Sequence, residues 1–112
     1  MKLSLKKSER LDDLQFEGLK LVQDKNLYAF TSDSVVLANF LKIKSNENAV
    51  EIGTGSGVIS ILATKKTNAK SITAFEIQTP LFKLAQKNLK LNQIKNVELI
   101  NDDVKNFKKY IL

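Results

Sequence analysis

The sequence contains neither cysteine nor histidine. Their absence excludes disulfides, thiolate catalysis, histidine general bases and nearly all zinc chemistry from this chain. No apolar run approaches the length of a membrane-spanning helix, and the first residues, Met1 to Lys7, lack the apolar core of a secretion signal. We therefore expect a cytoplasmic protein with no metal site and no membrane contact.

What remains is a basic chain of 112 residues with a formal charge of +6. This length suits one domain at most and is short for a doubly wound sheet, so we expect the chain to be part of something longer. The positive charge permits contact with a polyanion such as RNA. Lysines scattered over a solvated surface would produce the same charge.

The most informative stretch is Glu51-Ile52-Gly53-Thr54-Gly55-Ser56-Gly57, between a short apolar run and a helix-period apolar segment. This order predicts strand, tight loop and helix in a parallel α/β unit, with glycines where a ligand approaches the backbone. A dinucleotide would bring a pyrophosphate onto this loop, where Glu51 would repel it. An acid suits a cationic ligand, and S-adenosylmethionine carries a sulfonium and an ammonium group. The alternative is a glycine-rich turn that binds nothing.

Two further strands are expected, at residues 71–76 and 97–100, each followed by acidic residues. Ligands of open parallel sheets bind at the carboxyl ends of the strands, so Glu76 should lie beside the glycines and accept from ribose hydroxyls. After the third strand, Asp103 could accept from the adenine amine while the Val104 N–H donates to a ring nitrogen. Asp102 is the alternative if the register shifts by one residue.

A helix should follow the second of these strands, with Thr79 as its cap and Pro80 at its first position. Its buried stripe is expected to comprise four residues: Leu81, Leu84, Ala85 and Leu89. The lysines on its other side are interpreted as solvated.

The N-terminal part is expected to form a cap segment over residues 1–44, joined to a core of residues 45–112. Residues 8–14 suggest a surface turn or half-helix, and residues 18–23 and 27–30 suggest a hairpin around a turn at 24–26. A helix from about Asp33 to Leu41, capped by Thr31 or Ser32, should follow. Its predicted buried face comprises Val35, Val36, Leu37, Phe40 and Leu41.

The glycine loop, Glu76 and Asp103-Val104 resemble the three cofactor signatures of class I S-adenosylmethionine-dependent methyltransferases, which have a Rossmann-like α/β fold. Residues 9–14 and 30–40 resemble the bacterial valine-tRNA adenine-N6 methyltransferase family, which modifies the adenine beside the anticodon. That resemblance implies tRNA as partner and places Thr31 to Asp33 against the methionine end of the cofactor. The predicted cofactor-binding residues are Thr31, Asp33, Glu51, Gly53, Thr54, Gly55, Gly57, Glu76, Ile77, Asp103 and Val104.

Members of that family carry an Asn-Pro-Pro-Tyr or similar tetrapeptide after the fourth strand, which holds the target amine. Here the only proline is Pro80, and the chain ends at Tyr110-Ile111-Leu112, where the fourth strand is expected. We therefore expect the cofactor half of the fold, truncated after the third strand, and with that tetrapeptide absent the sequence assigns no catalytic residue. The first strand would have an open edge through which the chain could self-associate.

Three other functions remain open. A glutamine N-methyltransferase of the release-factor type shares the missing tetrapeptide. A non-catalytic module could bind the cofactor without transferring methyl. A nicotinamide-dependent oxidoreductase is the third, and Glu51 disfavours it.

Overall fold

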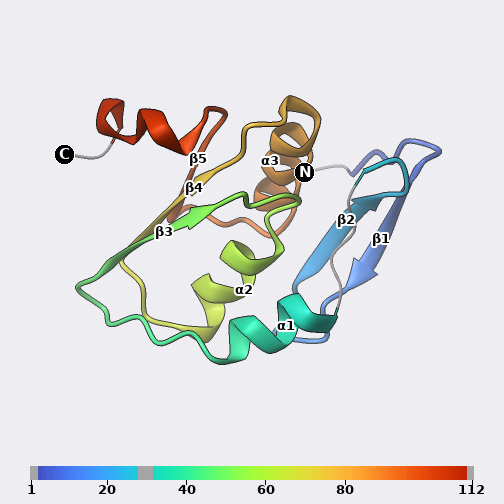
Figure 1. Ribbon diagram of the computed structural model, residues 1–112. Helices are drawn as coiled ribbons and strands as arrows, with labels where there is room; N and C mark the ends of the chain where they lie inside the picture. The colour runs from blue at the N-terminus through green and yellow to red at the C-terminus, as the bar shows by residue number, and fades with distance from the viewer. Residues whose placement is uncertain (1–2, 28–31, 111–112) are drawn as a thin grey trace.

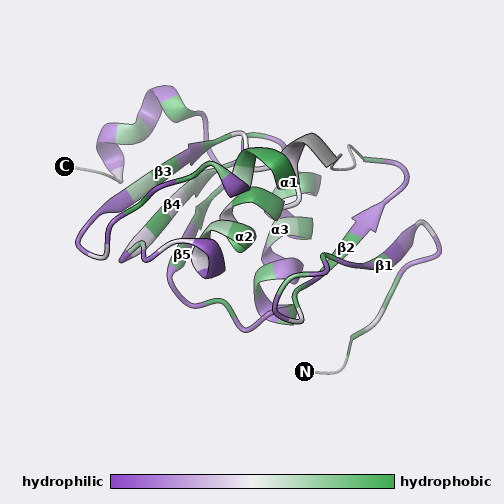
Figure 2. Ribbon diagram, turned by 90° about the horizontal axis from the view of Figure 1, so that it is seen from below, coloured by the Kyte–Doolittle hydropathy of each residue, from purple (hydrophilic) through white to green (hydrophobic). Residues whose placement is uncertain are grey.

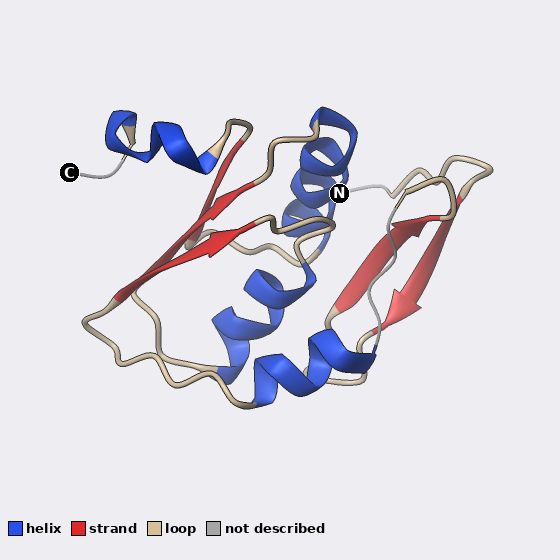
Figure 3. Ribbon diagram, viewed as in Figure 1, coloured by secondary structure: helices blue, strands red, loops and turns tan. Residues whose placement is uncertain are grey.

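The computed structural model of the protein describes residues 3–27 and 32–110 (Figure 1). A hairpin comes first, formed by strands β1 (Glu9–Asp13) and β2 (Lys20–Asp24), and helix α1 (Ser32–Asn39) follows it. The chain then alternates strands and helices, as Figure 3 shows. These elements are β3 (Asn48–Ile52), α2 (Val58–Lys66), β4 (Ser71–Phe75), α3 (Thr79–Leu91), β5 (Val97–Ile100) and the 3-10 segment η1 (Val104–Lys109).

The central sheet has the order β3-β4-β5, and all its strands are parallel. Ile52 lies opposite Phe75, and Phe75 lies opposite Ile100, so the carboxyl ends of the strands are level. Helices α2 and α3 supply the crossover connections that parallel strands need. This arrangement confirms the predicted Rossmann-like half-fold with flanking helices.

Helix α3 buries the four apolar residues that were predicted for it, Leu81, Leu84, Ala85 and Leu89. Its start differs from the prediction by one residue. Gln78 occupies the cap position, Thr79 is already helical and Pro80 follows inside the first turn. Proline is tolerated there because the first turn leaves its backbone N–H groups unpaired in any case.

The N-terminal hairpin pairs different segments from those predicted. Residues 9–13 form a strand rather than a turn or half-helix, and they pair with β2 from Glu9 opposite Asp24 to Asp13 opposite Lys20. The cross-strand ion pair between Lys20 Nζ and Asp13 Oδ2, 2.6 Å long, shows why charge density was misleading. Asp12 also accepts from the Gln23 side chain of β2, and a count of charges along the chain does not show such cross-strand partners. The predicted partner segment includes residues 28–30, which lie outside the described residues.

One hydrophobic core joins the hairpin to the α/β unit. It contains Leu14, Leu19 and Leu21 from the hairpin region together with Ile61 and Leu62 of α2. Figure 2 shows α2 coloured largely as hydrophobic between the sheet and the hairpin, whereas β1 is hydrophilic. The predicted boundary between residues 44 and 45 separates two segments of the sequence, and both of these segments contribute side chains to the same core.

Helix α1 does not bury the face that its sequence predicts. Ala38 is fully buried, but Val36, Leu37 and Phe40 are 52%, 53% and 75% exposed. The helix is only eight residues long and packs against α2. Its small residue, Ala38, belongs to the core that α2 shares, whereas Leu37 lines a pocket together with residues of β3.

Candidate functional site

The glycine loop lies directly after β3, at the carboxyl edge of the sheet. Gly53 and Gly55 have φ values of 69° and 58°, in the left-handed region that favours glycine. A Cβ atom built at either position would meet nothing within 4 Å, so open space lies next to this backbone. The amides of Gly53 and Thr54 both donate to the Phe75 carbonyl, at 2.9 and 3.0 Å, which ties the loop to the end of β4.

Glu76 holds the same loop from the next strand. Its Oε1 accepts from the Gly55 N–H at 2.8 Å, and its Oε2 accepts from the Gln78 N–H at 2.9 Å. The residue is only 4% exposed, so these charge-assisted hydrogen bonds lie away from bulk water. A carboxylate has about four acceptor sites, and each oxygen can therefore accept a further donor. The sequence-predicted proximity of Glu76 and the glycines is present.

Glu51 is tied to the other end of the loop. Its Oε1 accepts from the Thr54 hydroxyl at 2.6 Å and also from the Ser60 hydroxyl on α2. Glu51 and Ser60 line an apolar pocket of about 260 Å³ between α1, α2 and β3. This pocket lies beside β3, and Glu76 is not among the residues that line it.

A second pocket, of about 150 Å³, opens at the carboxyl edge of the sheet. Apolar residues and two aspartates form its wall. It is lined by Ile52, Gly53, Phe75, Ile77, Asp102, Asp103 and Val104. Four predicted cofactor residues from three different segments of the chain thus surround one cavity.

The two aspartates at this pocket have different partners. Asp102 accepts from the Asp103 N–H, the Asn106 side chain and the Tyr110 hydroxyl, at 2.7–2.9 Å. These hydrogen bonds, that from Asn106 foremost, lower the pKa of Asp102 to about 2. Asp103 Oδ1 accepts the Lys105 N–H at 2.9 Å and so caps η1. Because Asp103 has fewer donors, it has more capacity to accept from a ligand.

Some predicted site residues cannot be placed. Thr31 lies outside the described residues. Asp33 belongs to α1, but its side chain lies outside the described part of the structure. Contact of Thr31 and Asp33 with the methionine end of a cofactor therefore stays a prediction.

Sequence reasoning missed several residues that support the site. Ser60 bonds to Glu51, Gln78 donates to Glu76, and the Asn101 amide donates to the Glu76 carbonyl at 2.9 Å. Only Asn101 has a recognisable signal, because it follows a strand at the same sheet edge. Within residues 3–27 and 32–110 no group of three acidic residues could hold a metal ion, and no helix is long and apolar enough to cross a membrane.

Comparison with known proteins identifies similar sequences. The model of the family described as ribosomal protein L11 methyltransferase (PrmA) matches residues 30–110. A Methanocaldococcus jannaschii protein, provisionally described as a protein N5-glutamine methyltransferase, is 36% identical over 91 residues, covering 81% of this chain and 45% of that protein. A tRNA1(Val) (adenine(37)-N6)-methyltransferase of a Flavobacteriaceae bacterium is 26% identical over 74 residues, covering 66% of this chain and 32% of its own length.

A solved structure shows the same fold. The crystal structure of Methanocaldococcus jannaschii TYW2 in complex with AdoMet superposes with a TM-score of 0.76 at 22% identity. The match covers 93% of this chain and 48% of that one. The chain thus spans less than half the length of the relatives and of the solved structure described above.

Proposed function

This chain belongs to the family described as ribosomal protein L11 methyltransferase (PrmA), within the class I S-adenosylmethionine-dependent methyltransferases. We propose that it is the cofactor-binding half of a methyltransferase that acts on the N6 amine of an adenine in tRNA. The class resemblance read from the sequence is confirmed by the family match. The methyl acceptor is the part that is proposed.

The observation that carries the proposal is the geometry around Gly55. Its N–H donates to the Glu76 carboxylate, and open space lies beside the loop at this point. The pocket lined by Ile77, Asp103 and Val104 is next to it. These residues fit an adenosyl group. Glu76 retains acceptor sites for ribose hydroxyls, and the Ile77 and Val104 side chains offer apolar walls to a flat ring. Asp103 offers an acceptor for an exocyclic amine.

When bound, S-adenosylmethionine would supply an electrophilic methyl group on its sulfonium. The chain's own contribution is to bind and orient, since positioning accounts for much of the acceleration of such transfers. Glu76 would fix the ribose, and Asp103 would fix the ring. The residues that would hold the acceptor amine are not assigned within this chain.

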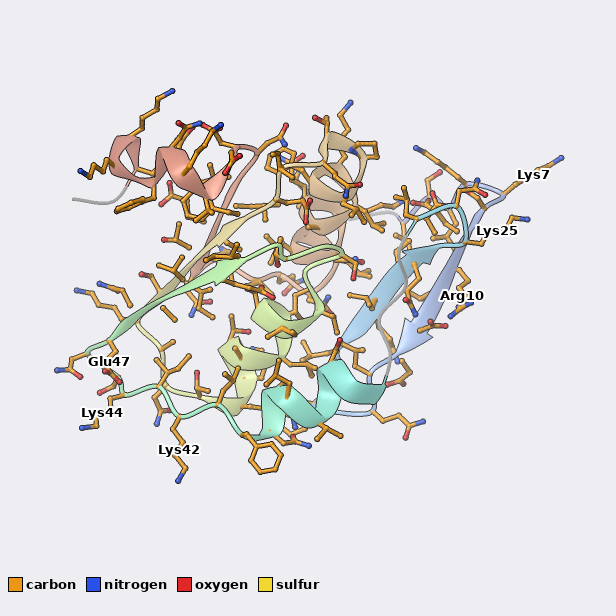
Figure 4. The ribbon with its side chains drawn as sticks, in the orientation of Figure 1. Lys7, Arg10, Lys25, Lys42, Lys44 and Glu47 are labelled. Atoms are coloured by element: carbon orange, nitrogen blue, oxygen red, sulfur yellow. The ribbon has the colours of Figure 1, made fainter. Side chains whose placement is uncertain are left out.

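Three observations support tRNA as the acceptor. A tRNA1(Val) adenine-N6 methyltransferase is among the relatives, residues 9–14 and 30–40 resemble that family, and the chain carries a charge of +6. Figure 4 shows basic side chains pointing into solvent at two separate places. Lys7, Arg10 and Lys25 extend from the hairpin end, and Lys42 and Lys44 from the loop before β3. Exposed cations of this kind can contact RNA phosphates.

Isothermal titration with S-adenosylhomocysteine tests the cofactor assignment. We expect Glu76→Gln to weaken binding about tenfold or more, because a hydrogen bond to a charged group contributes about 1.5–3 kcal/mol and about 1.4 kcal/mol corresponds to tenfold. Glu98→Gln is the matched control, since Glu98 is an exposed glutamate of β5 in the same sheet. Equal affinities for the two variants would contradict the role of Glu76.

Titration with NAD tests the oxidoreductase alternative. A dinucleotide would place phosphates over a loop whose flanking side chains, Glu51 and Glu76, are acidic. We expect heat from S-adenosylhomocysteine and none from NAD. Heat from NAD alone would overturn the proposed function.

The second candidate is glutamine N-methylation, favoured by the provisional description of the relative that is 36% identical. Labelled S-adenosylmethionine incubated with the chain and either total tRNA or a peptide-chain release factor separates the two acceptors. Label in adenine supports the proposal, and label in a protein glutamine supports the second candidate. Transfer to either acceptor would argue against a non-catalytic module.

A further inference from the structure

Asn88 of α3 and Asn92, the residue that caps the C-terminal end of this helix, hold the edge of strand β2. Asn88 Oδ1 accepts from the Val22 N–H at 2.7 Å, and its Nδ2 donates to the Val22 carbonyl at 3.0 Å. Asn92 repeats the pattern with Lys20, at 2.8 and 2.7 Å. The edge of β2 that faces away from β1 is therefore paired with side chains of a helix.

The spacing of the two asparagines explains why a helix can do this. Residues four apart on a helix lie on one face and rise about 6 Å, while alternate residues of a strand advance about 6.6 Å. Val22 and Lys20 direct their backbone groups to the same edge because they are two residues apart. The helical row thus matches the strand repeat closely enough for both amides to bond.

Asn88 makes one contact that Asn92 does not. Its Nδ2 also donates to the Ser56 carbonyl at 2.9 Å, and Ser56 lies between Gly55 and Gly57 in the loop. Asn88 is completely buried and Ser56 is only 4% exposed, so no bulk water can replace this bond. One buried amide therefore bonds to the hairpin and to the glycine loop at once.

We propose that Asn88 is a positioning residue through which the docked N-terminal hairpin holds the glycine loop in its cofactor-binding conformation. The connection runs from Val22 through Asn88 to Ser56, and the adjacent Gly55 N–H bonds to Glu76. An unpaired carbonyl at Ser56 would be costly in this buried position, so losing the amide favours a different loop conformation. This inference rests on the proposed role of the loop as the S-adenosylmethionine site.

The sequence provides a matched pair of variants. Asn88→Ala removes the bonds to Val22 and Ser56, whereas Asn92→Ala removes the bonds to Lys20 and a bond within α3, and leaves the loop untouched. Both lose an amide that holds β2. We expect Asn88→Ala to weaken S-adenosylhomocysteine binding about tenfold, the effect of about 1.4 kcal/mol, and Asn92→Ala by less than about twofold. The titrations are made at a temperature at which both variants are folded.

Amide hydrogen exchange supplies a readout that needs no ligand. We expect the Gly55 and Gly57 N–H groups to exchange faster in Asn88→Ala than in the wild type, and at wild-type rates in Asn92→Ala. Equal effects of the two variants on affinity and on loop exchange would overturn the proposal and leave Asn88 as a packing residue. Failure of the wild-type chain to bind S-adenosylhomocysteine would instead refute the proposed function of the loop.

A wild-type experiment covers the case in which Asn88→Ala does not fold. Exchange followed through low denaturant concentrations reports which amides open together. If the hairpin holds the loop, the amides of Val22 and Gly57 should show the same opening free energy and the same denaturant dependence. Loop amides that open independently of Val22 would contradict the coupling.

Discussion

At the scale of single residues, neighbours in the sequence have different surroundings. Asp102 and Asp103 are adjacent and chemically identical, yet Asp102 accepts from Asn106 and Tyr110 while Asp103 caps η1 through Lys105. Tyr110 in turn lies edge-on to Phe75, with ring centroids 5.9 Å apart. The pocket beside Gly53 thus has one aspartate that accepts three hydrogen bonds and another that accepts fewer.

The Tyr110 hydroxyl should titrate above the ordinary range. Its hydrogen bond to Asp102 raises the pKa of Tyr110, because ionisation would remove the donated proton and place two negative charges together. In a Tyr28→Phe chain, Tyr110 is the only tyrosine. Absorbance of tyrosinate should then show a pKa above 10, lowered toward 10 by an added Asp102→Asn. Asp103→Asn should leave the pKa of Tyr110 unchanged. If Asp103→Asn lowered this pKa and Asp102→Asn did not, the assignment of the hydrogen bond to Asp102 would be wrong.

At the scale of elements, η1 depends on polar contacts more than on burial. Among its described residues none is fully buried, and Asp102 bonds both to Asn106 within it and to Tyr110 at its end. Its position therefore depends on hydrogen bonds to one carboxylate. This differs from α3, which is held by a buried apolar stripe.

Acid should loosen η1 before the rest of the fold. The folded pKa of Asp102, about 2, lies below its ordinary value of 3.8, so its stabilising contribution is complete above about pH 4 and is lost as the pH falls toward 2. Amide resonances of Asn106 and Phe107 should shift across that range while those of α3 stay in place. The Asp102→Asn variant should show no such titration. If the resonances of η1 and of α3 were lost together as the pH falls, the acid-induced change would be unfolding of the whole chain, and the prediction would be wrong.

At the scale of the whole molecule, the β3 edge of the sheet exposes apolar side chains. In the described part of the chain β3 pairs with β4 alone, and Val50 and Ile52 are 51% and 67% exposed. Leu37 and Leu41 flank the same edge and line the pocket of about 260 Å³ with them. An unpaired apolar edge strand is a template for pairing with another chain.

We therefore expect the isolated chain to self-associate through β3. Ile52→Lys places a charge on the open edge and should shift the chain toward the monomer in size-exclusion chromatography with light scattering. Leu5→Lys is the control, because Leu5 is an exposed leucine in the N-terminal segment and the charge change is the same. A monomeric, cooperatively unfolding wild-type chain would refute this prediction.

Much of the architecture could be predicted because its signals are local. Each of these signals is contained in a short segment of the sequence. They are the apolar runs before Gly53 and Glu76, the alternate glycines and the apolar stripe of α3. The predictions that were wrong concern segments whose structure depends on contacts with distant parts of the chain. Strand β1 is charged and pairs with β2 across a turn with positive φ at Gln15, Glu17 and Gly18, which residues 9–13 alone do not indicate.

By itself, then, the sequence determined the parallel α/β unit, the glycine loop and the acids placed at its edge, since chain periodicity and glycine's freedom at positive φ are properties of short segments. Only the tertiary structure decided that α1 leaves apolar side chains exposed and that Glu51 and Glu76 hold the loop from different sides. It alone also joined Asn88 to Val22 and Ser56, which are 66 and 32 residues away. A buried amide is assigned its partners by the packing of elements that are distant in the chain, and no local pattern records that choice.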